Sequence, residues 1–212
     1  TAKSLIKKIQ FRFYNPSVFL GKNVQFIGTD NIEIGENVTL SDNLWINVNL
    51  RDRSKRVFIG KCSHVGRDNF FTVGSRLEIG EFFMSSIGCS LISAGHSFVD
   101  PFIPHLISGE TVSQRMIIGR NVFMGAHSKI VGNITVGNGV IIGANALVLE
   151  DIPSFSVAVG NPAKVIKRYC FQKCEWVKVS DYVGDEAVDE SFYVGALLNR
   201  TSNWPYSVYA AS

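Results

Sequence analysis

The sequence predicts an all-β solenoid, a coil of short strands that turns a corner every six residues. Two observations predict it: apolar residues recur with a period of six, and glycine often follows them directly. A helix would repeat its apolar residues every three or four positions and a simple strand every two, so a period of six fits neither. Internal repeats of this kind are typical of solenoids, in which each unit stacks on its neighbours.

The repeat is most regular over residues 118–152, where the first place of every unit is apolar and the fifth is small or β-branched. The same unit recurs upstream in blocks of three that start at Ile34, Ile59 and Ile79. Of the fifteen leading positions in all blocks, fourteen are apolar, and Ser85 is the exception. We therefore expect the leading residue to point into the core and the glycines to lie where the backbone turns tightly.

The spacing of the blocks predicts three units per turn and hence a triangular cross-section. The starts at 34, 59, 79, 118 and 136 differ by 25, 20, 39 and 18 residues, so eighteen residues make one turn and the excess is inserted. The two large insertions are 51–58, which carries a basic run, and about 97–116. Loops that leave a rigid solenoid are common places for a functional site.

Composition argues against several other classes of protein. The chain has 212 residues, 46% of them hydrophobic and 18% charged, which is enough for one domain with a core. A net charge of +3 without a long block of one sign gives no reason to expect nucleic-acid binding. No stretch has the roughly 18 uncharged apolar residues of a membrane span. Four cysteines without a C-x-x-C pair predict no disulfide framework, and we expect a cytoplasmic protein without a removable signal sequence.

Three features together resemble the hexapeptide-repeat acetyltransferases, and within them the galactoside, maltose and polysaccharide O-acetyltransferase group. They are the Ile-Gly-x-x-Val units, the turn at 94–96 before the long loop, and the sequence VGNPAKVIK at 159–167. The resemblance covers about residues 24–168. It implies a left-handed parallel β-helix with a protruding loop at about 97–116, assembled as a homotrimer with acetyl-CoA between neighbouring subunits.

The resemblance divides the chain into three parts. We expect the acetyltransferase domain over 24–168, preceded by a capping segment over 1–23 and followed by a helix or extended arm over 169–212. The first segment has a second interpretation, as an amphipathic strip that touches a membrane. Capping is favoured because the open end of a solenoid has to be covered.

His96 is the residue expected to carry the chemistry, because it stands where the resemblance places the catalytic histidine of the family. Transfer of an acetyl group from a thioester to a hydroxyl requires removal of the hydroxyl proton, and imidazole suits this task near neutral pH. A polar group should hold the ring in one orientation, and the candidates are Asp68, Asn69 and Asp100. His105, inside the loop, is a candidate for the acceptor pocket.

The resemblance also implies where acetyl-CoA, the acetyl donor, is held, and it implies no metal. The pantetheine arm should contact backbone groups at two successive corners, and the N–H of the first alanine should stabilise the oxyanion. Two lysines should contact the phosphates, and a phenylalanine stands where the galactoside enzymes have tryptophan. These positions are Phe123, Gly125, Ala126, Gly143, Ala144, Lys164 and Lys167. The polar acceptor-binding position of the family aligns with Gly66, two residues before Asp68.

Two other classes of function compete with this one. A hexapeptide-repeat carbonic anhydrase would need three histidines on one zinc, two of them close in sequence, and the histidines at 64, 96, 105 and 127 show no such pair. A non-catalytic sugar-binding solenoid would need neither His96 nor the 159–167 segment. For the acceptor, we favour a sugar hydroxyl of a cell-surface polysaccharide or its lipid-linked or nucleotide-linked precursor; the alternative is a free galactoside or an antibiotic.

Overall fold

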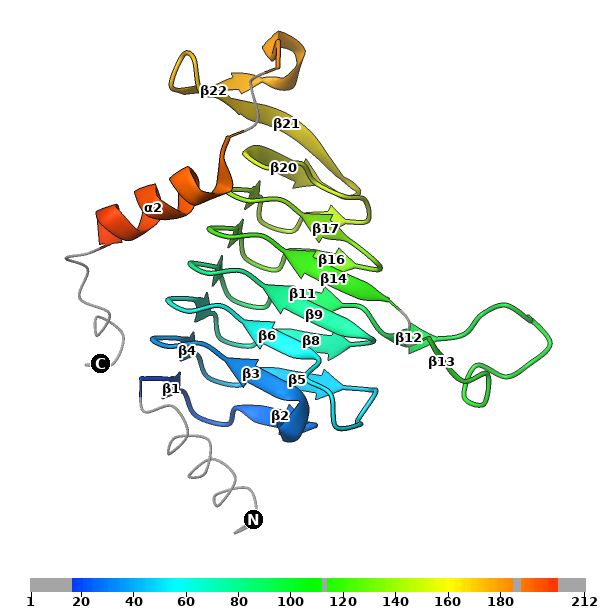
Figure 1. The fold of residues 1–212 in the computed structure, drawn as a ribbon. Helices are drawn as coiled ribbons and strands as arrows, with labels where there is room; N and C mark the ends of the chain where they lie inside the picture. The colour runs from blue at the N-terminus through cyan, green and yellow to red at the C-terminus, as the bar shows by residue number, and fades with distance from the viewer. Residues whose placement is uncertain (1–16, 112–113, 185–187, 202–212) are drawn as a thin grey trace.

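The computed structural model describes residues 17–111, 114–184 and 188–201, and it is a triangular coil of short parallel strands (Figure 1). Each complete turn gives one strand to each of three sheets, which we name A, B and C in chain order. Strands of successive turns pair in parallel, so the sheets run along the axis of the coil. The predicted left-handed parallel β-helix is confirmed.

Sheet A has nine strands, in the order β1 (Phe19–Leu20), β4 (Thr39–Leu40), β7 (His64–Val65), β10 (Met84–Ser85), β15 (Phe123–Met124), β18 (Ile141–Ile142), β20 (Ser156–Gly160), β21 (Ala163–Cys170) and β22 (Glu175–Lys178). Sheet B contains β2 (Gln25–Ile27), β5 (Trp45–Val48), β8 (Phe70–Val73), β11 (Ser90–Ile92), β16 (Lys129–Val131) and β19 (Leu147–Val148). Sheet C contains β3 (Ile32–Ile34), β6 (Val57–Ile59), β9 (Arg76–Ile79), β14 (Arg115–Ile118) and β17 (Thr135–Val136). Two short 3-10 helices, η1 (Thr29–Asn31) and η2 (Val179–Asp181), complete the ends. We number the turns 1 to 7 by their strand in sheet A, from β1 to β20.

The core is the inside of the triangle, and the six-residue repeat fills it as predicted. All fifteen leading residues are buried, as are the fifth-place residues from Val122 to Ile152. The polar exception, Ser85, is buried without cost to hydrogen bonding, because its hydroxyl donates to Oδ1 of Asn69 (2.8 Å) and accepts from the Gly66 N–H (3.0 Å).

Glycine follows the leading residue for a reason that the period alone does not give. Five glycines stack at the corner where the chain passes from sheet C to sheet A, the CA corner: Gly35, Gly60, Gly80, Gly119 and Gly137. A Cβ at any of them would lie 2.4–2.7 Å from backbone of the next turn. Close approach between turns, rather than a left-handed backbone, therefore requires glycine in this column.

Both insertions leave the coil at one corner, where the chain passes from sheet B to sheet C, which we name the BC corner. The first ends at Arg56, because Val57 and Phe58 belong to β6, and the second ends before Arg115, the first residue of β14. Both are thus slightly shorter than predicted. A hydrogen bond from Asn49 Nδ2 to Oε2 of Glu110 (3.1 Å) joins the segment just before the first insertion to the second insertion.

The two ends of the coil differ. At the N-terminal end β1 already pairs with β4, so the coil begins before residue 24; residues 1–16 of the predicted capping segment lie outside the described residues. At the other end β21 and β22 add antiparallel to β20. Helix α2 (Glu190–Thr201) packs back on the coil through Tyr193, whose hydroxyl accepts from Asn121 Nδ2 (2.9 Å) and whose ring meets Phe155 edge-on. No helix among the described residues is long and apolar enough to cross a membrane.

Candidate active site

The long loop leaves turn 4 through a two-stranded hairpin. Strand β12 (Gly95–His96) pairs antiparallel with β13 (Glu110–Thr111), and the Ser97 N–H donates to the Gly109 carbonyl (2.9 Å). Gly109 has a φ of 85°, which a residue with a side chain adopts at a cost. Beyond the hairpin the loop projects away from the coil (Figure 1). The hairpin thus pairs the two residues at the loop base with each other.

His96 is exposed at this base, directly opposite Glu110 in the hairpin register. The neighbouring hydrogen bond at Ser97 makes this a non-hydrogen-bonded pair, the kind that brings side chains closest together on one face. The imidazole makes no hydrogen bond with the described residues. An exposed ring at the mouth of a loop is accessible to a second molecule.

Asp100 and His105 lie farther out on the loop, and both are exposed. The Asp100 carboxylate accepts from the Phe102 N–H (2.9 Å), which stabilises the turn at Pro101. The His105 carbonyl accepts from the Ser108 hydroxyl (3.0 Å). Neither side chain is hydrogen-bonded to the ring of His96.

Asp68 and Asn69 lie at another corner, where the chain passes from sheet A to sheet B, the AB corner. Strand β8 separates them from the BC corner by four residues of extended chain, on the order of 13 Å. Asn69 is buried and satisfied: its amide donates to the Ser86 carbonyl (2.8 Å) and its oxygen accepts from Ser85. Asn69 therefore stabilises the corner, and within one chain neither residue is brought to His96.

The candidate cofactor positions stack along the AB corner of turns 5 and 6. Gly125 and Gly143 give their N–H groups to the next turn, to Ile142 and Ala158. A Cβ at Gly125 would lie 2.6 Å from the Ala144 nitrogen, so the turns approach closely. Among the described residues the Ala126 N–H has no acceptor. At Gly125–Ala126 and Gly143–Ala144 the corner is thus a narrow edge of backbone with a free donor.

The remaining cofactor candidates flank this edge. Phe123 points outward from β15 and is 38% exposed. Lys164 lies opposite Val159 at the start of β21, and its ammonium pairs with Glu150 (3.2 Å). Lys167 lies farther along β21, opposite Lys178, so two cations are adjacent there. Nowhere in the described ranges do three His, Cys, Asp or Glu side chains gather so that they could hold a metal ion.

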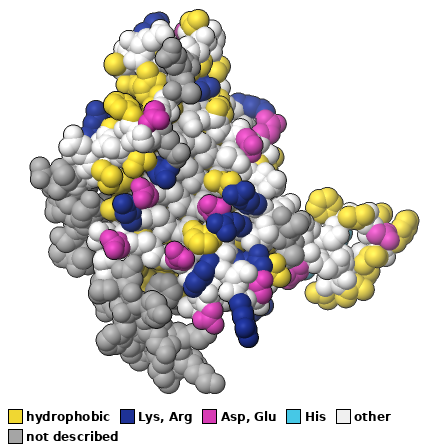
Figure 2. All heavy atoms as spheres, in the orientation of Figure 1, with side chains coloured by type: hydrophobic (Ala, Val, Ile, Leu, Met, Phe, Trp, Pro, Cys, Tyr) yellow, Lys and Arg dark blue, Asp and Glu magenta, His cyan; other side chains and the backbone are white. Residues whose placement is uncertain are grey.

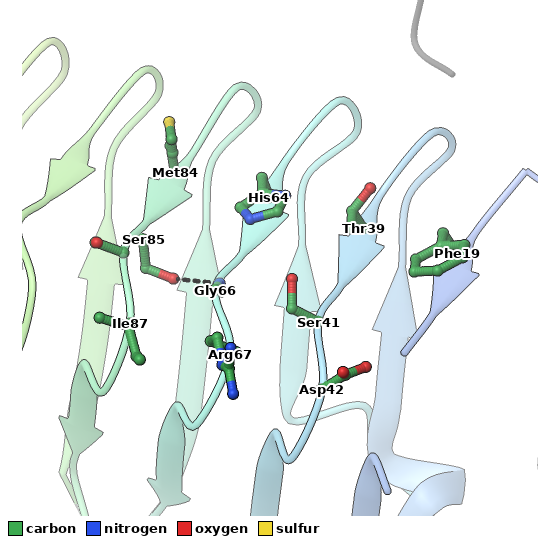
Figure 3. A pocket seen from close by; sticks show the side chains of 11 residues that line it. Phe19, Thr39, Ser41, Asp42, His64, Gly66, Arg67, Met84, Ser85 and Ile87 are labelled. Carbon is green, nitrogen blue, oxygen red and sulfur yellow. Dashed lines mark hydrogen bonds between the residues drawn. The ribbon is translucent and has the colours of Figure 1, made fainter. Parts of the chain in front are cut away.

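A pocket of about 420 Å³ lies on the same edge, over turns 1 to 4 (Figure 3). Its outer wall is a ladder of residues from sheet A, and its inner wall is the AB corner itself. His64 in the ladder is half-buried, and burial lowers its pKa. Gly66, where the resemblance places an acceptor-binding residue, lines it. The lining comprises Phe19, Thr39, Ser41, Asp42, His64, Gly66, Arg67, Met84, Ser85, Ser86 and Ile87.

Two features of this site, the position of Glu110 and the sheet A pocket, were not predicted from the sequence. Glu110 faces His96 only because of the hairpin register, which no repeat in the loop reveals; the Ser-Gly step at 108–109 was the available turn signal. The sheet A pocket forms from residues that are about twenty positions apart and lie side by side only through the coil.

Comparisons with known proteins agree with this architecture. The family model for the bacterial transferase hexapeptide (six repeats) matches residues 115–150. A probable acetyltransferase of Mycobacterium tuberculosis is 30% identical over 168 residues, which are 75% of this chain and 54% of that protein. A Staphylococcus aureus protein named as an acetyltransferase is 31% identical over 131 residues, 61% of this chain and 64% of that protein. The chain therefore spans about half to two thirds of these relatives.

Solved structures give the same class. A variant of AntD, an N-acyltransferase from Bacillus cereus in complex with dTDP-4-amino-4,6-dideoxyglucose and coenzyme A, has a TM-score of 0.61 at 25% identity, covering 81% of this chain and 91% of that one. A maltose O-acetyltransferase from Clostridium difficile has a TM-score of 0.50 at 26% identity, covering 71% and 66%. The chain folds as a β-helix of hexapeptide repeats and is similar to these acyltransferases. Its resemblance to the hexapeptide-repeat acetyltransferases is confirmed.

Proposed function

We propose that this protein is an O-acetyltransferase that moves an acetyl group from acetyl-CoA to a sugar hydroxyl, with His96 as general base. The observation that carries the proposal is the exposed His96 ring, fixed at the loop base opposite Glu110. The preferred acceptor is a cell-surface polysaccharide or its precursor. The sequence has four cysteines and no C-x-x-C pair, which supports a reducing cytoplasmic location.

The residues present fit acetyl-CoA. The AB corner at Gly125–Ala126 and Gly143–Ala144 offers bare backbone to a narrow pantetheine arm, and Lys164 and Lys167 lie beyond it toward the C-terminal end. Acetyl-CoA supplies an activated acyl group as a thioester. His96 takes the proton of the acceptor hydroxyl as that oxygen attacks, and later returns it to the leaving thiolate. The Ala126 N–H donates to the developing oxyanion, and Glu110 replaces Asp68, Asn69 and Asp100 as the group that orients the ring.

This mechanism requires two copies of the chain. His96 lies at the BC corner and Ala126 at the AB corner, on opposite edges of sheet B. One chain therefore has its base and its oxyanion donor too far apart to act on one carbonyl carbon. The loop also exposes apolar side chains, with Phe98 83%, Phe102 92% and Leu106 89% exposed, and such a surface favours burial against a neighbour. We propose a homotrimer with sites shared between subunits.

Shared sites predict complementation between two inactive variants. His96→Ala removes the base, and Ala144→Trp, at an exposed corner, blocks the cofactor edge. In randomly mixed trimers about a quarter of the sites receive an intact half from each neighbour, so coexpression should restore about a quarter of wild-type activity. Light scattering at micromolar concentration should give three times the chain mass. A monomer, or a mixture as inactive as its parents, would contradict shared sites.

The acceptor is tested by a screen for acetyl-CoA-dependent transfer, with thiol release as the readout. The panel contains capsule and O-antigen fragments, maltose, a galactoside, an antibiotic and a nucleotide-linked amino sugar. An amino sugar is the second candidate acceptor, because the solved neighbour AntD is an N-acyltransferase and its structure holds one. Transfer to a hydroxyl supports the proposal, transfer only to an amine supports the second candidate, and no transfer to any of them counts against both.

Lys164 and Lys167 are expected to bind the phosphates of acetyl-CoA, and their replacement tests this contact. Lys164 and Lys167 are exposed, so each phosphate contact should contribute on the order of 1 kcal/mol and weaken with salt. Lys164→Ala/Lys167→Ala should raise the KM for acetyl-CoA at nearly constant kcat. Glu150→Gln is the matched opposite, since it frees Lys164 from its pair and should lower that KM. If the double variant and wild type discriminate equally between CoA and 3′-dephospho-CoA, the lysines do not contact that phosphate.

A further inference from the structure

Three arginines border an open hollow of about 550 Å³ on sheet C, beside the base of the long loop. Arg56 comes from the end of the first insertion, Arg76 from β9 and Arg115 from β14. Arg76 and Arg115 are partners in the parallel register, so their side chains lie next to each other on one face. Figure 2 shows Lys and Arg side chains gathered on this side of the coil with acidic ones among them.

Arg76 and Arg115 are held next to each other by hydrogen bonds to Glu78. Arg76 Nε and Arg115 Nη2 both donate to the same carboxylate oxygen, Oε1. The Arg76 guanidinium also lies over the Phe58 ring, 4.3 Å from its centroid. Burial alone would raise the pKa of Glu78, but the hydrogen bonds and charges of the two arginines outweigh burial and lower it. One carboxylate thus serves two cations.

Arg56 has more of its hydrogen-bond donors occupied than Arg76 or Arg115. Its Nη1 donates to the Ser75 carbonyl (2.8 Å), and its Nη2 pairs with Asp52 (2.6 Å), while its side chain is only 16% exposed. The three guanidinium groups face two carboxylates, which leaves an excess of one positive charge. Arg76 uses only Nε among the described contacts, so its two terminal nitrogens have unused donors. The hollow therefore presents preorganised guanidinium donors and unbalanced charge.

The position of the three arginines along the coil indicates whether they would contact acetyl-CoA or the acceptor. The candidate cofactor residues occupy turns 5 to 7, and His96 leaves turn 4. The arginines belong to turns 2 to 4, and Arg115 follows the loop directly. They thus lie on the side of His96 away from the lysines expected to hold CoA. An anion bound at the hollow would belong to the acceptor.

We propose that Arg76 and Arg115, supported by Arg56, bind a phosphate or diphosphate group of the acceptor, so that the acceptor is an activated sugar rather than a neutral free one. The inference rests on the proposed transferase function and narrows its substrate class. Guanidinium forks bind phosphate oxygens in pairs, and their partner Glu78 fixes them without consuming all their donors.

Calorimetric titration with inorganic pyrophosphate tests the site without requiring any turnover. Arg76→Gln/Arg115→Gln should weaken binding at least about tenfold. Glu78→Gln should strengthen it, because the amide oxygen still accepts from both arginines while the competing negative charge is removed. Arg200→Gln, on helix α2, is the matched arginine control and should bind as wild type does. Lys164→Ala/Lys167→Ala is titrated alongside, so that binding at those lysines is subtracted. Equal affinity in wild type and the double variant, or an equal loss in Arg200→Gln, overturns the site.

Two further arms connect the site to the acceptor. Competition between dTDP and farnesyl diphosphate for the pyrophosphate site distinguishes a nucleotide-linked from a lipid-linked acceptor. In transfer assays the double variant should raise the KM for a diphosphate-linked sugar about tenfold or more and leave that for acetyl-CoA unchanged. Arg76→Lys/Arg115→Lys keeps the charge and should recover only part of the affinity. Transfer to neutral sugars with no pyrophosphate binding overturns this inference alone; arginine-dependent pyrophosphate binding without any transfer overturns the transferase function alone.

Discussion

Replacing His96 with alanine is expected to lower the single-turnover rate of acetyl transfer by roughly 10²- to 10⁴-fold at saturating acetyl-CoA. General-base help is felt in the transition state, so the affinity for acetyl-CoA should barely change. The ring is exposed and opens no cavity when removed, so the thermal midpoint should also stay constant. Rapid quench with labelled acetyl-CoA, using the best acceptor from the screen, measures the rate.

The same experiment tests the role of Glu110. Glu110→Gln keeps the shape and leaves His96 in place, so its loss should be smaller, about tenfold, again with unchanged acetyl-CoA affinity. A rate for His96→Ala within about threefold of wild type would exclude this histidine as the base and direct attention to Asp68 and Asp100.

The second large effect is expected at Gly119, in the glycine column of the CA corner. An alanine Cβ there would lie 2.6 Å from the Gly137 carbonyl carbon and 2.7 Å from the Asn138 nitrogen. Both are backbone atoms of the next turn, so neither can swing aside, and the turns must separate. We expect Gly119→Ala to cost about 3 kcal/mol or more, which is a fall of roughly 6 to 12 °C in thermal midpoint.

Gly195→Ala is the matched control for that prediction. Apart from its chain neighbours and the backbone of helix α2 itself, no atom of the described residues lies within 4 Å of the added methyl group, and alanine favours a helix over glycine by about 0.5 to 1 kcal/mol. The midpoint of this variant should therefore stay constant or rise slightly, at a protein concentration matched to wild type. A Gly119→Ala variant as stable as Gly195→Ala would show that the turns can move apart at little cost.

The repeat made the fold predictable because every turn obeys one rule. Equivalent residues of successive turns lie next to each other and have the same surroundings, as Met124 and Ile142 do. The six-residue period therefore indicates directly which side chains are buried. Even Ser85 obeys it, since its position is buried although its side chain is polar.

The parts of the site that the sequence did not predict come from contacts that do not repeat. The pairing of His96 with Glu110 depends on a single hairpin, and the sharing of Glu78 by two arginines brings together residues that the long loop separates in the sequence. Asn69 was a candidate for the site, yet the hydrogen bonds of a buried corner use its amide. The side-chain contacts of the candidate site are therefore seen only in the three-dimensional structure.

The uniform register of the coil also makes its loops exchangeable parts. Leu91 pairs with Ile130 in the same way as with Phe71, although the path to Ile130 includes the whole excursion at the BC corner. The pairing of the coil strands does not depend on which segment is inserted at that corner, provided the chain returns at Arg115. Loops of other lengths grafted between Ser97 and Gly109 should thus be accepted by the same body, and a library of such grafts would be a direct route to enzymes with new acceptors.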